Sequence, residues 1–404
     1  MFPLALVITD PCNIITDLWE NKKLALATIL DIRKAFDSLN RKILIKKLRN
    51  LHIKGQALNW LIDYLTNRKQ AVEIEHYLKN LETKSRSSLK ETEIGIPQGS
   101  VLGPLLFLIF INSFPDELTE GKESVMFADN TTILEPIDIT KNLDVQIEEN
   151  MEQVTNICDK MDLEINRTKT IHMNFTNTMN NKQQTMINQR TTHTKLADST
   201  CFLGITIDKH LNWEAHIDNL HKKLSSVLYA LRRLRQITNK ETAKIAYHAL
   251  FESQIRFGII AWGAASQTQL QRILVLQKKA IRIIEQLQCR EHCKDHFKSN
   301  NILSLISLYI FETISQIKKS PHTKRIDQHK HNIRIGHNLD LPHHRLTKTS
   351  KTPNIMGIKL FNRLPETLTS ISSTHKFTKQ LKQYLINRPY YTLSEFFEEH
   401  SRHT

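Results

Sequence analysis

Residues 23–32 read KLALATILDI, almost entirely apolar, with an aspartate, Asp31, as the last residue but one. A short unbroken apolar run is typical of a strand that is buried on both faces. We therefore expect a buried strand that delivers Asp31 to the edge of a sheet. Beyond it, apolar residues at helical spacing predict two helices, separated at Gly55.

Glycine and proline concentrate in residues 95–112, which read GIPQGSVLGPLLFLIFIN. The whole chain has ten glycines in 404 residues, and three of them fall in this segment. Such a concentration marks a special backbone, and the apolar residues after it predict a helix near Val101–Asn112. Before this segment, residues 68–94 predict strands joined by a polar turn around Lys84–Ser88.

Residues 125–134 predict a hairpin of two short strands around Asp129 and Asn130. A helix over 143–161 and a strand over 170–175 follow. The order of strand, helices, strands, helix, hairpin, helix and strand predicts an α+β fold, a sheet with helices packed on one face.

The second half of the chain differs in charge from the first. Residues 1–200 hold 24 Lys and Arg against 26 Asp and Glu, whereas residues 201–404 hold 32 against 15. This excess of positive charge on one half is more than solubility needs and is typical of a surface that faces a polyanion. We therefore expect the second half to bind nucleic acid.

A long amphipathic helix is predicted from Trp213 to Gln236 by apolar residues at helical spacing. Its other face carries five basic side chains, Lys222, Lys223, Arg232, Arg233 and Arg235. The polar residues 177–200 predict a linker before it, and Phe202–Asp208 predicts a short strand. Residues 241–404 predict further helices of mixed pattern.

Asp31 and Asp129 each have an ordinary interpretation, Asp31 as a helix cap and Asp129 with Asn130 as a tight-turn pair. Considered together they indicate more, because both lie at strand ends of the expected sheet. Carboxylates on adjacent strand ends can hold two divalent cations about 3.5–4 Å apart, the arrangement that nucleotidyl transfer uses. Mg²⁺ prefers such oxygen ligands.

Five segments occur in order over residues 24–208: LDIRKAFDSLNRKILIKKL (30–48), GIPQGSVLGPLLFLIFIN (95–112), SVMFADNTTIL (124–134), LEINRTKT (163–170) and FLGITID (202–208). They resemble motifs A to E of the reverse transcriptases of non-LTR retrotransposons (LINEs). GIIAWGA (258–264) and FNRLP (361–365) resemble, more loosely, the C-terminal region of jockey-like elements.

This resemblance implies a role for each matching residue. Asp31 and Asp129 would be the ligands of two Mg²⁺ ions, assisted by the main-chain carbonyl of Ile32. Lys169 would be the general acid that protonates pyrophosphate, the alternative being a solvated lysine without a role. The nucleotide pocket would contain Ile32, Phe36, Gln98 and Gly99.

Phe36 matches the steric gate of the family, an aromatic ring that collides with a ribose 2′-hydroxyl and so selects deoxynucleotides. The alternative is a phenylalanine of the core. A glycine at position 99 suits a place where the backbone approaches a ligand closely.

The resemblance also implies a right-hand polymerase fold with an antiparallel palm sheet. The expected domains are a palm with a remnant of fingers over 1–176, the linker 177–200, the primer grip and helical thumb over 201–240, and a basic, mainly helical C-terminal region over 241–404. About thirty residues precede Asp31, too few to form fingers, so we expect the fingers to be largely missing.

Motif C departs from the family pattern F-A-D-D, because residues 127–130 read FADN. Asn130 stands in the place of the third catalytic carboxylate, and a neutral amide can ligate only through its carbonyl oxygen. Removing one well-placed electrostatic group typically costs about 10²–10³ in rate. With the short N-terminal segment, this departure predicts a truncated and inactive copy.

Three hypotheses therefore stand. The first is an RNA-directed DNA polymerase that uses an RNA template, a DNA primer and dNTPs. The second is a non-catalytic remnant of a mobile element that binds RNA or single-stranded DNA, and the third is a relic without a role. Few, scattered cysteines and the lack of a signal peptide or long apolar segment predict a nuclear or cytoplasmic protein without a membrane partner.

Overall fold

The structure, a computed structural model, describes residues 4–78, 81–177, 196–320 and 338–401. These residues form two compact units. The sheet unit consists of the described residues of 25–174, and the helical unit consists of those of 1–24, 175–178 and 197–404. The segment before Ala25 belongs to the helical unit, although it precedes β1 in the sequence.

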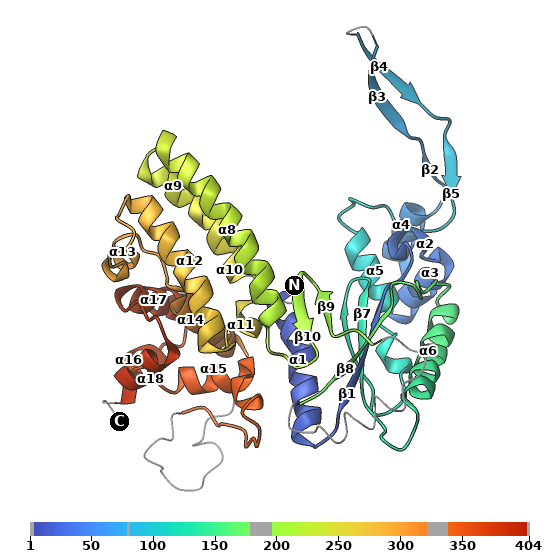
Figure 1. The fold of residues 1–404 in the computed structure, drawn as a ribbon. Coiled ribbons are helices and arrows are strands. Elements are labelled where there is room, and N and C mark those ends of the chain that lie inside the picture. The colour runs from blue at the N-terminus through green and yellow to red at the C-terminus, as the bar shows by residue number, and fades with distance from the viewer. Residues whose placement is uncertain (1–3, 79–80, 178–195, 321–337, 402–404) are drawn as a thin grey trace. The chain divides into compact units, whose positions relative to one another are not determined.

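The sheet unit is built on a four-stranded sheet in the order β6–β7–β1–β8 (Figure 1). Its strands are β1 (Ala25–Leu30), β6 (Glu123–Phe127), β7 (Asn130–Pro136) and β8 (Ile171–Phe175). β7 pairs antiparallel with both β1 and β6. Ala25, Leu26, Ala27 and Leu30 of β1 are buried, which confirms the buried strand predicted from the apolar run.

The helices of this unit begin where the sequence provides caps. Asn40 accepts hydrogen bonds from the backbone N–H groups of Lys42 and Ile43, and Asn142 accepts one from Asp144. Pro104 lies in the first turn of the helix that follows the glycine-rich segment. The helices are α2 (Ala35–Ser38), α3 (Arg41–Asn50), α4 (Gly55–Leu65), α5 (Gly103–Ile111), the short 3₁₀ helix η1 (Pro115–Glu117) and α6 (Leu143–Lys160).

Two small antiparallel ribbons lie between α4 and α5. The strand β2 (Arg68–Gln70) pairs with β5 (Lys90–Thr92), and β3 (Glu73–Leu78) pairs with β4 (Leu81–Arg86). The two ribbons follow one another and extend away from the four-stranded sheet (Figure 1). The predicted turn around Lys84–Ser88 is wrong for residues 84–86, which belong to β4, whereas residues 87–89 do connect β4 to β5. Lys84 lies within β4 and pairs with Glu73 and Glu75 across the ribbon, so its polarity belongs to the exposed face of a strand.

The helical unit contains one hairpin of strands, β9 (Ser199–Phe202) and β10 (Ile205–Asp208). A single strand over Phe202–Asp208 was predicted, and this prediction is wrong. Leu203 and Gly204 have φ angles of 47° and 85°, which reverse the chain in a two-residue turn. β9 also occupies the end of the predicted linker 177–200, of which residues 178–195 lie outside the described residues.

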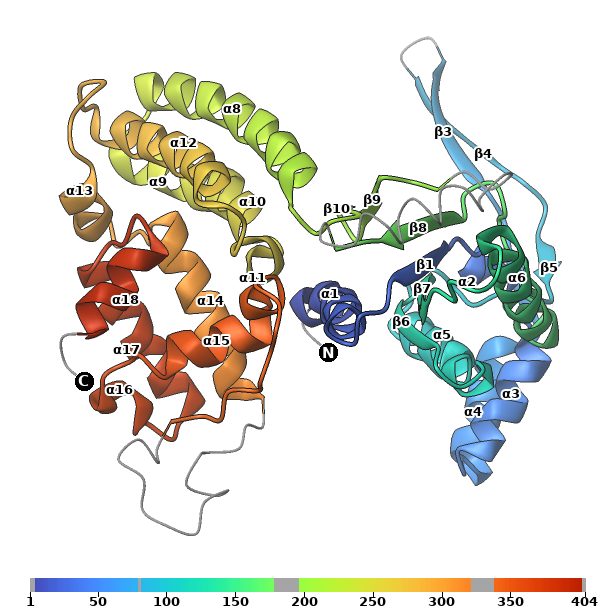
Figure 2. The same cartoon turned by 60° about the horizontal axis from the view of Figure 1, so that its bottom comes forward.

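The remainder of the helical unit is a group of helices, in which α8 and α12 pack side by side (Figure 2). α1 contacts α11 and the turn η4. The elements are α1 (Leu4–Glu20), α8 (Glu214–Ile237), α9 (Lys240–Ala246), the π-helical η2 (Tyr247–Glu252), α10 (Ser253–Arg256), α11 (Ile259–Trp262), α12 (Gln267–Glu285), α13 (Lys294–Ser299), α14 (Leu305–Lys319), η4 (Thr349–Lys351), α15 (Pro353–Phe361), α16 (Glu366–Thr369), α17 (Thr374–Asn387) and α18 (Leu393–Ser401).

The predicted amphipathic helix from Trp213 to Gln236 is confirmed as α8, which buries Leu220, Leu224, Leu228 and Leu231. No helix among the described residues is both long enough and apolar enough to cross a membrane.

Candidate active site

The register of the sheet brings the two predicted carboxylates to one end. Leu30, the last residue of β1, pairs with Thr131 of β7. Continued by one residue, this register places Asp31 opposite Asn130, the first residue of β7. Asp129 immediately precedes Asn130 in the turn from β6, so Asp31 and Asp129 lie at the same end of the sheet.

The turn between β6 and β7 consists of Ala128 and Asp129, because Phe127 pairs with Asn130. The predicted turn pair, Asp129 and Asn130, is therefore wrong by one position. Ala128 has a φ of 53°, an unusual conformation for a residue with a side chain. Strain of this kind gathers at functional sites, and here it lies directly before Asp129.

Lys169 comes to the same end from the segment between α6 and β8. Its Nζ lies 3.8 Å from Oδ2 of Asp31, and both side chains are substantially exposed. The segment is held by an antiparallel bridge between Ile32 and Ile165. In this bridge the N–H of Asn166 donates to the carbonyl of Asp31 at 2.8 Å, and the N–H of Arg33 donates to the carbonyl of Glu164. The carbonyl of Ile32 accepts neither bond.

The glycine-rich segment before α5 is joined to the chain after β1. The N–H of Gly95 donates to the carbonyl of Leu39 at 2.7 Å, and Nε2 of Gln98 donates to Oδ1 of Asp37 at 2.8 Å. A side chain could not replace Gly95, since a Cβ there would lie 2.5 Å from the carbonyl oxygen of Asp37 at a φ of +76°. Gly99 has a similar φ but is exposed and has open space around it.

Phe36 belongs to α2, in the part of the chain after β1 that the glycine-rich segment contacts. Its ring stacks on the fully buried ring of Phe107 in α5, with the ring centroids 4.5 Å apart. The carbonyl of Phe36 accepts a hydrogen bond from the N–H of Ile96 at 2.9 Å. Phe36 as a whole is half-buried, in contrast to the fully buried Phe107.

The model of one family matches this chain over residues 5–207, and it describes reverse transcriptase (RNA-dependent DNA polymerase). The matched region is half of the chain and contains every predicted catalytic and nucleotide-binding residue. The chain belongs to the reverse transcriptase family.

Curated relatives include the RNA-directed DNA polymerase from the mobile element jockey of Drosophila melanogaster, 27% identical over 67% of this chain and 30% of that protein. The corresponding protein of Drosophila funebris is 28% identical over the same shares. This reverse transcriptase chain thus spans about 30% of the length of these relatives. They confirm the resemblance to jockey-like non-LTR elements. A solved telomerase from Candida albicans, in complex with a fragment of telomeric RNA, matches 98% of this chain and 52% of its own, at 11% identity and a TM-score of 0.36.

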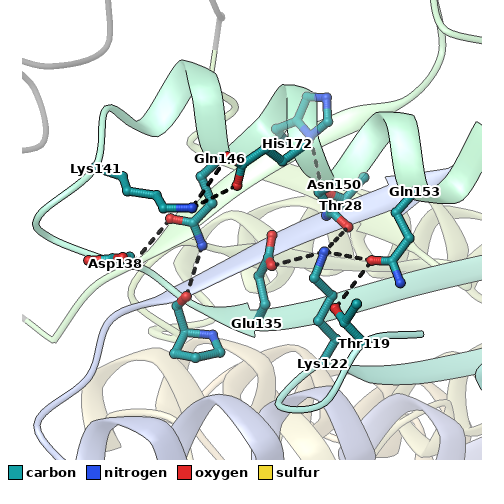
Figure 3. A network of polar contacts seen from close by, with 12 residues as sticks. Thr28, Thr119, Lys122, Glu135, Asp138, Lys141, Gln146, Asn150, Gln153 and His172 are labelled. Atoms are coloured by element: carbon teal, nitrogen blue, oxygen red, sulfur yellow. Dashed lines mark hydrogen bonds and ion pairs between the residues drawn. The ribbon is translucent and has the colours of Figure 1, made fainter.

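A buried polar network that the sequence did not predict joins the strands of the reverse transcriptase sheet to α6 (Figure 3). Nζ of Lys122 lies 3.4 Å from the buried carboxylate of Glu135 in β7 and donates to the amide of Asn150 in α6 at 3.0 Å. Asn150 donates to Thr28 of β1, which also contacts His172 of β8. Burial raises the pKa of Glu135 although Lys122 opposes this shift.

The reverse transcriptase family generally uses divalent metal ions. The oxygen ligands at this end of the sheet are of the kind that such ions prefer. Asp31 and Asp129 provide two carboxylates, the number with which protein sites commonly bind Mg²⁺ when substrate phosphates complete its coordination. In the described part of the chain, no three His, Cys, Asp or Glu side chains are grouped to hold a metal ion.

The five predicted nucleic-acid-binding residues of α8 do not have equal environments. Lys222, Lys223, Arg232 and Arg233 are exposed. Arg235 instead donates from Nε to the carbonyl of Ile284, at the end of α12, and from its guanidinium to the carbonyl of Thr238, both at 3.0 Å. Arg235 thus joins the ends of two helices, a structural role that the basic pattern alone did not reveal.

Proposed function

We propose that this chain carries the polymerase site of a non-LTR reverse transcriptase, which extends a DNA primer by copying an RNA template with dNTPs. The observation that carries the proposal is the register of β1 and β7, in which Leu30, the residue before Asp31, pairs with Thr131, two residues after Asp129. The family and the names of the jockey relatives support the same reaction.

In this proposal Asp31, Asp129 and the carbonyl of Ile32 hold two Mg²⁺ ions. When bound, these ions activate the primer 3′-hydroxyl and stabilise the charge on the leaving pyrophosphate. The Ile32 carbonyl is suited to this use because it takes no part in the bridge to Ile165. Lys169 protonates the departing pyrophosphate, and its ammonium group lies 3.8 Å from Oδ2 of Asp31, at the end of the sheet where the cations would be held.

Phe36 is the steric gate in this proposal. Its stacking on Phe107 orients the ring, and the residue is only partly buried, as a surface that collides with a ribose 2′-hydroxyl has to be. Gln98 is oriented by its hydrogen bond to Asp37, and the open space around Gly99 lets a nucleotide approach the backbone.

Asn130 lowers the activity of this site in the proposal. It lies opposite Asp31 in the continued register, where a third carboxylate would face the same cations. The neutral amide contributes one carbonyl oxygen and no charge. Removing one such electrostatic group typically costs about 10²–10³ in rate.

A second candidate function is nucleic-acid binding without catalysis, with the predicted thumb and C-terminal region (201–240 and 241–404) as the binding part. The exposed cations of α8 favour it, because they carry positive charge whether or not the polymerase site works. Either function belongs in the nucleus or the cytoplasm, where template RNA is found.

The two candidates are separated by primer extension on poly(rA)/oligo(dT) with Mg²⁺ or Mn²⁺. We expect little incorporation by the unaltered chain and about 10²–10³ times more by Asn130→Asp. Adding Asp31→Asn or Asp129→Ala to that variant should abolish the gain, whereas Asp63→Asn, at an exposed position of α4, should leave it unchanged.

If Asn130→Asp binds template and primer but incorporates no more dNTP than the unaltered chain, nucleic-acid binding without catalysis is the remaining function. Incorporation that persists in Asp129→Ala would mean that the polymerase site lies elsewhere.

A further inference from the structure

The outer face of α8 carries one continuous stripe of exposed side chains. Lys222, Ser226, Tyr229 and Arg233 follow one another at steps of four, three and four residues, and all four are exposed. This spacing places them on one face of the helix over about 17 Å. The leucines of α8 are buried on the opposite face, so the stripe is not needed for the packing of the helix.

Tyr229 is the aromatic member of this stripe and is 66% exposed. In contrast, Tyr247 and Tyr309 of the same unit are almost completely buried. Tyr229 has no hydrogen bond and no ring contact with any residue that the structure describes. One exposed tyrosine is ordinary on a protein surface, but the charges around this ring are not.

Two pairs of cations flank Tyr229, Lys222 with Lys223 and Arg232 with Arg233. None of these four forms an ion pair with a described residue. The acidic residues of α8 lie in its first turns, and Asp218, one of them, is paired with Arg272 at 2.7 Å. The positive charge around the ring is therefore uncompensated and complementary to a polyanion.

A hollow of about 550 Å³ lies beside the stripe, between α8 and the end of α12. Arg232, Arg235, Lys279 and Arg282 line it, and no lining residue is acidic. Arg232 precedes Arg233 of the stripe, so the hollow continues the positive surface from α8 to α12. Arg235 and Arg282 donate to main-chain carbonyls. The guanidinium of Arg232 and the ammonium of Lys279 are therefore the groups that can meet a backbone phosphate next to the stripe.

We propose that Tyr229 is a stacking platform for an unpaired base of single-stranded nucleic acid, whose phosphates lie against the cations on either side. A free aromatic ring between cations is the combination by which proteins bind single strands. In a duplex the base faces are covered by their neighbours, so the ring selects single strands. The inference rests on the proposed nucleic-acid binding by α8 and adds the residue that contacts bases.

The test measures binding of the full chain to two labelled strands at several salt concentrations. One is a 20-mer of mixed sequence, and the other is a 20-mer of the same backbone in which every position is abasic. Tyr229→Ala should weaken binding of the first strand about 5- to 100-fold at fixed salt. It should not change the dependence of log K on log salt, because no phosphate contact is lost. On the abasic strand the variant and the unaltered chain should bind equally.

Two control variants separate stacking from a general loss of surface. Tyr229→Phe keeps the ring and should bind within about twofold of the unaltered chain. Ile237→Ala removes a side chain that is 82% exposed on the same helix, and it should also have no effect. Circular dichroism checks that α8 remains folded in each variant.

If Tyr229→Ala weakens binding of both strands equally, or of neither, Tyr229 does not stack on a base, although the cationic surface can still bind phosphates. Failure of the unaltered chain to bind either strand in a salt-dependent way would instead overturn the proposed nucleic-acid surface itself.

Discussion

The ammonium group of Lys169 lies 3.8 Å from Oδ2 of Asp31. The contact depends on the bridge between Ile32 and Ile165, which holds the segment before β8 against the end of β1. Both side chains are exposed, so the pair contributes little to stability.

The first prediction separates proton donation by Lys169 from its charge. In the Asn130→Asp background, Lys169→Ala should lower the rate of dNTP incorporation by about 10²–10⁴, the usual contribution of a general acid. Lys169→Arg should be as slow, because an arginine keeps the positive charge beside Asp31 but does not release its proton. Single-turnover extension over a range of pH measures both variants.

Lys160→Ala is the matched control, since Lys160 is exposed and its one ion pair among the described residues is with Glu117 on the surface. Full recovery of the rate in Lys169→Arg would show that Lys169 acts through charge on Asp31 and not as an acid.

The second prediction concerns Gly95, whose backbone joins the glycine-rich segment to the chain after β1. Gly95→Ala should lower the free energy of unfolding of the sheet unit by roughly 2–5 kcal/mol, through backbone strain and a clash with the carbonyl of Asp37. Gly121→Ala is the control, because Gly121 also has a positive φ but has no atom within 4 Å of the added Cβ. Urea unfolding followed by circular dichroism should show a clearly smaller loss for Gly121→Ala, and equal losses would contradict the steric argument.

The sequence predicted the elements that depend on local pattern and missed those that depend on pairing. The apolar run of β1, the helical spacing of the leucines in α3 and the leucine face of α8 carry their own signals, and the structure confirms them. The turn at Ala128 was missed because Asp129 and Asn130 look like a better turn pair, while the pairing of Phe127 with Asn130 decides the register. A sequence does not display that register.

Contacts between residues far apart in the chain could not be predicted from the sequence pattern either. The ion pair of Lys122 and Glu135 looks like two solvated charges in the sequence, and only the fold shows that it is buried under α6. Arg235 looked like its basic neighbours until the structure placed it against the end of α12. The turn at Leu203 and Gly204, in contrast, could have been found from the glycine inside the apolar pattern.

The third prediction follows from His216, a buried histidine near the start of α8. Its ring lies 5.6 Å from that of Trp262, and Nδ1 accepts the N–H of Thr206 at 3.4 Å. Burial, and to a smaller extent the nearby charge of Lys223, lowers the pKa of His216 to about 4. Between pH 6.5 and 4 the unfolded chain therefore binds a proton that the folded chain does not, so lowering the pH through this window destabilises the helical unit.

At pH 5 the loss should be about 2 kcal/mol relative to pH 7.5. Hydrogen exchange of the α8 and β10 amides, corrected for intrinsic rates, measures it. His216→Phe should remove most of this pH dependence, whereas substitution of the exposed His375 by Gln should preserve it. An unchanged pH dependence in His216→Phe would show that another group titrates in this window.

The last prediction divides the basic residues of α8 by their contacts. Lys222, Lys223, Arg232 and Arg233 are exposed and have no ion pair with a described residue, so each is free to contact a phosphate. Each such contact releases condensed counterion and contributes about −0.7 to the slope of log K against log salt for a single strand. Replacing all four with Gln should therefore make the slope less steep by about 3, with no change in stability.

Arg235→Gln should instead lower stability and leave the salt slope almost unchanged. Loss of its bonds to the carbonyls of Ile284 and Thr238 leaves two helix ends without partners, which should cost about 1–3 kcal/mol of stability and change the salt slope by less than about 0.7. Titration of a labelled 20-mer at several salt concentrations, with thermal unfolding of each variant, measures both quantities. A slope that changes as much in Arg235→Gln as in the fourfold variant would contradict this division, because it would make the helix-joining arginine the principal phosphate contact.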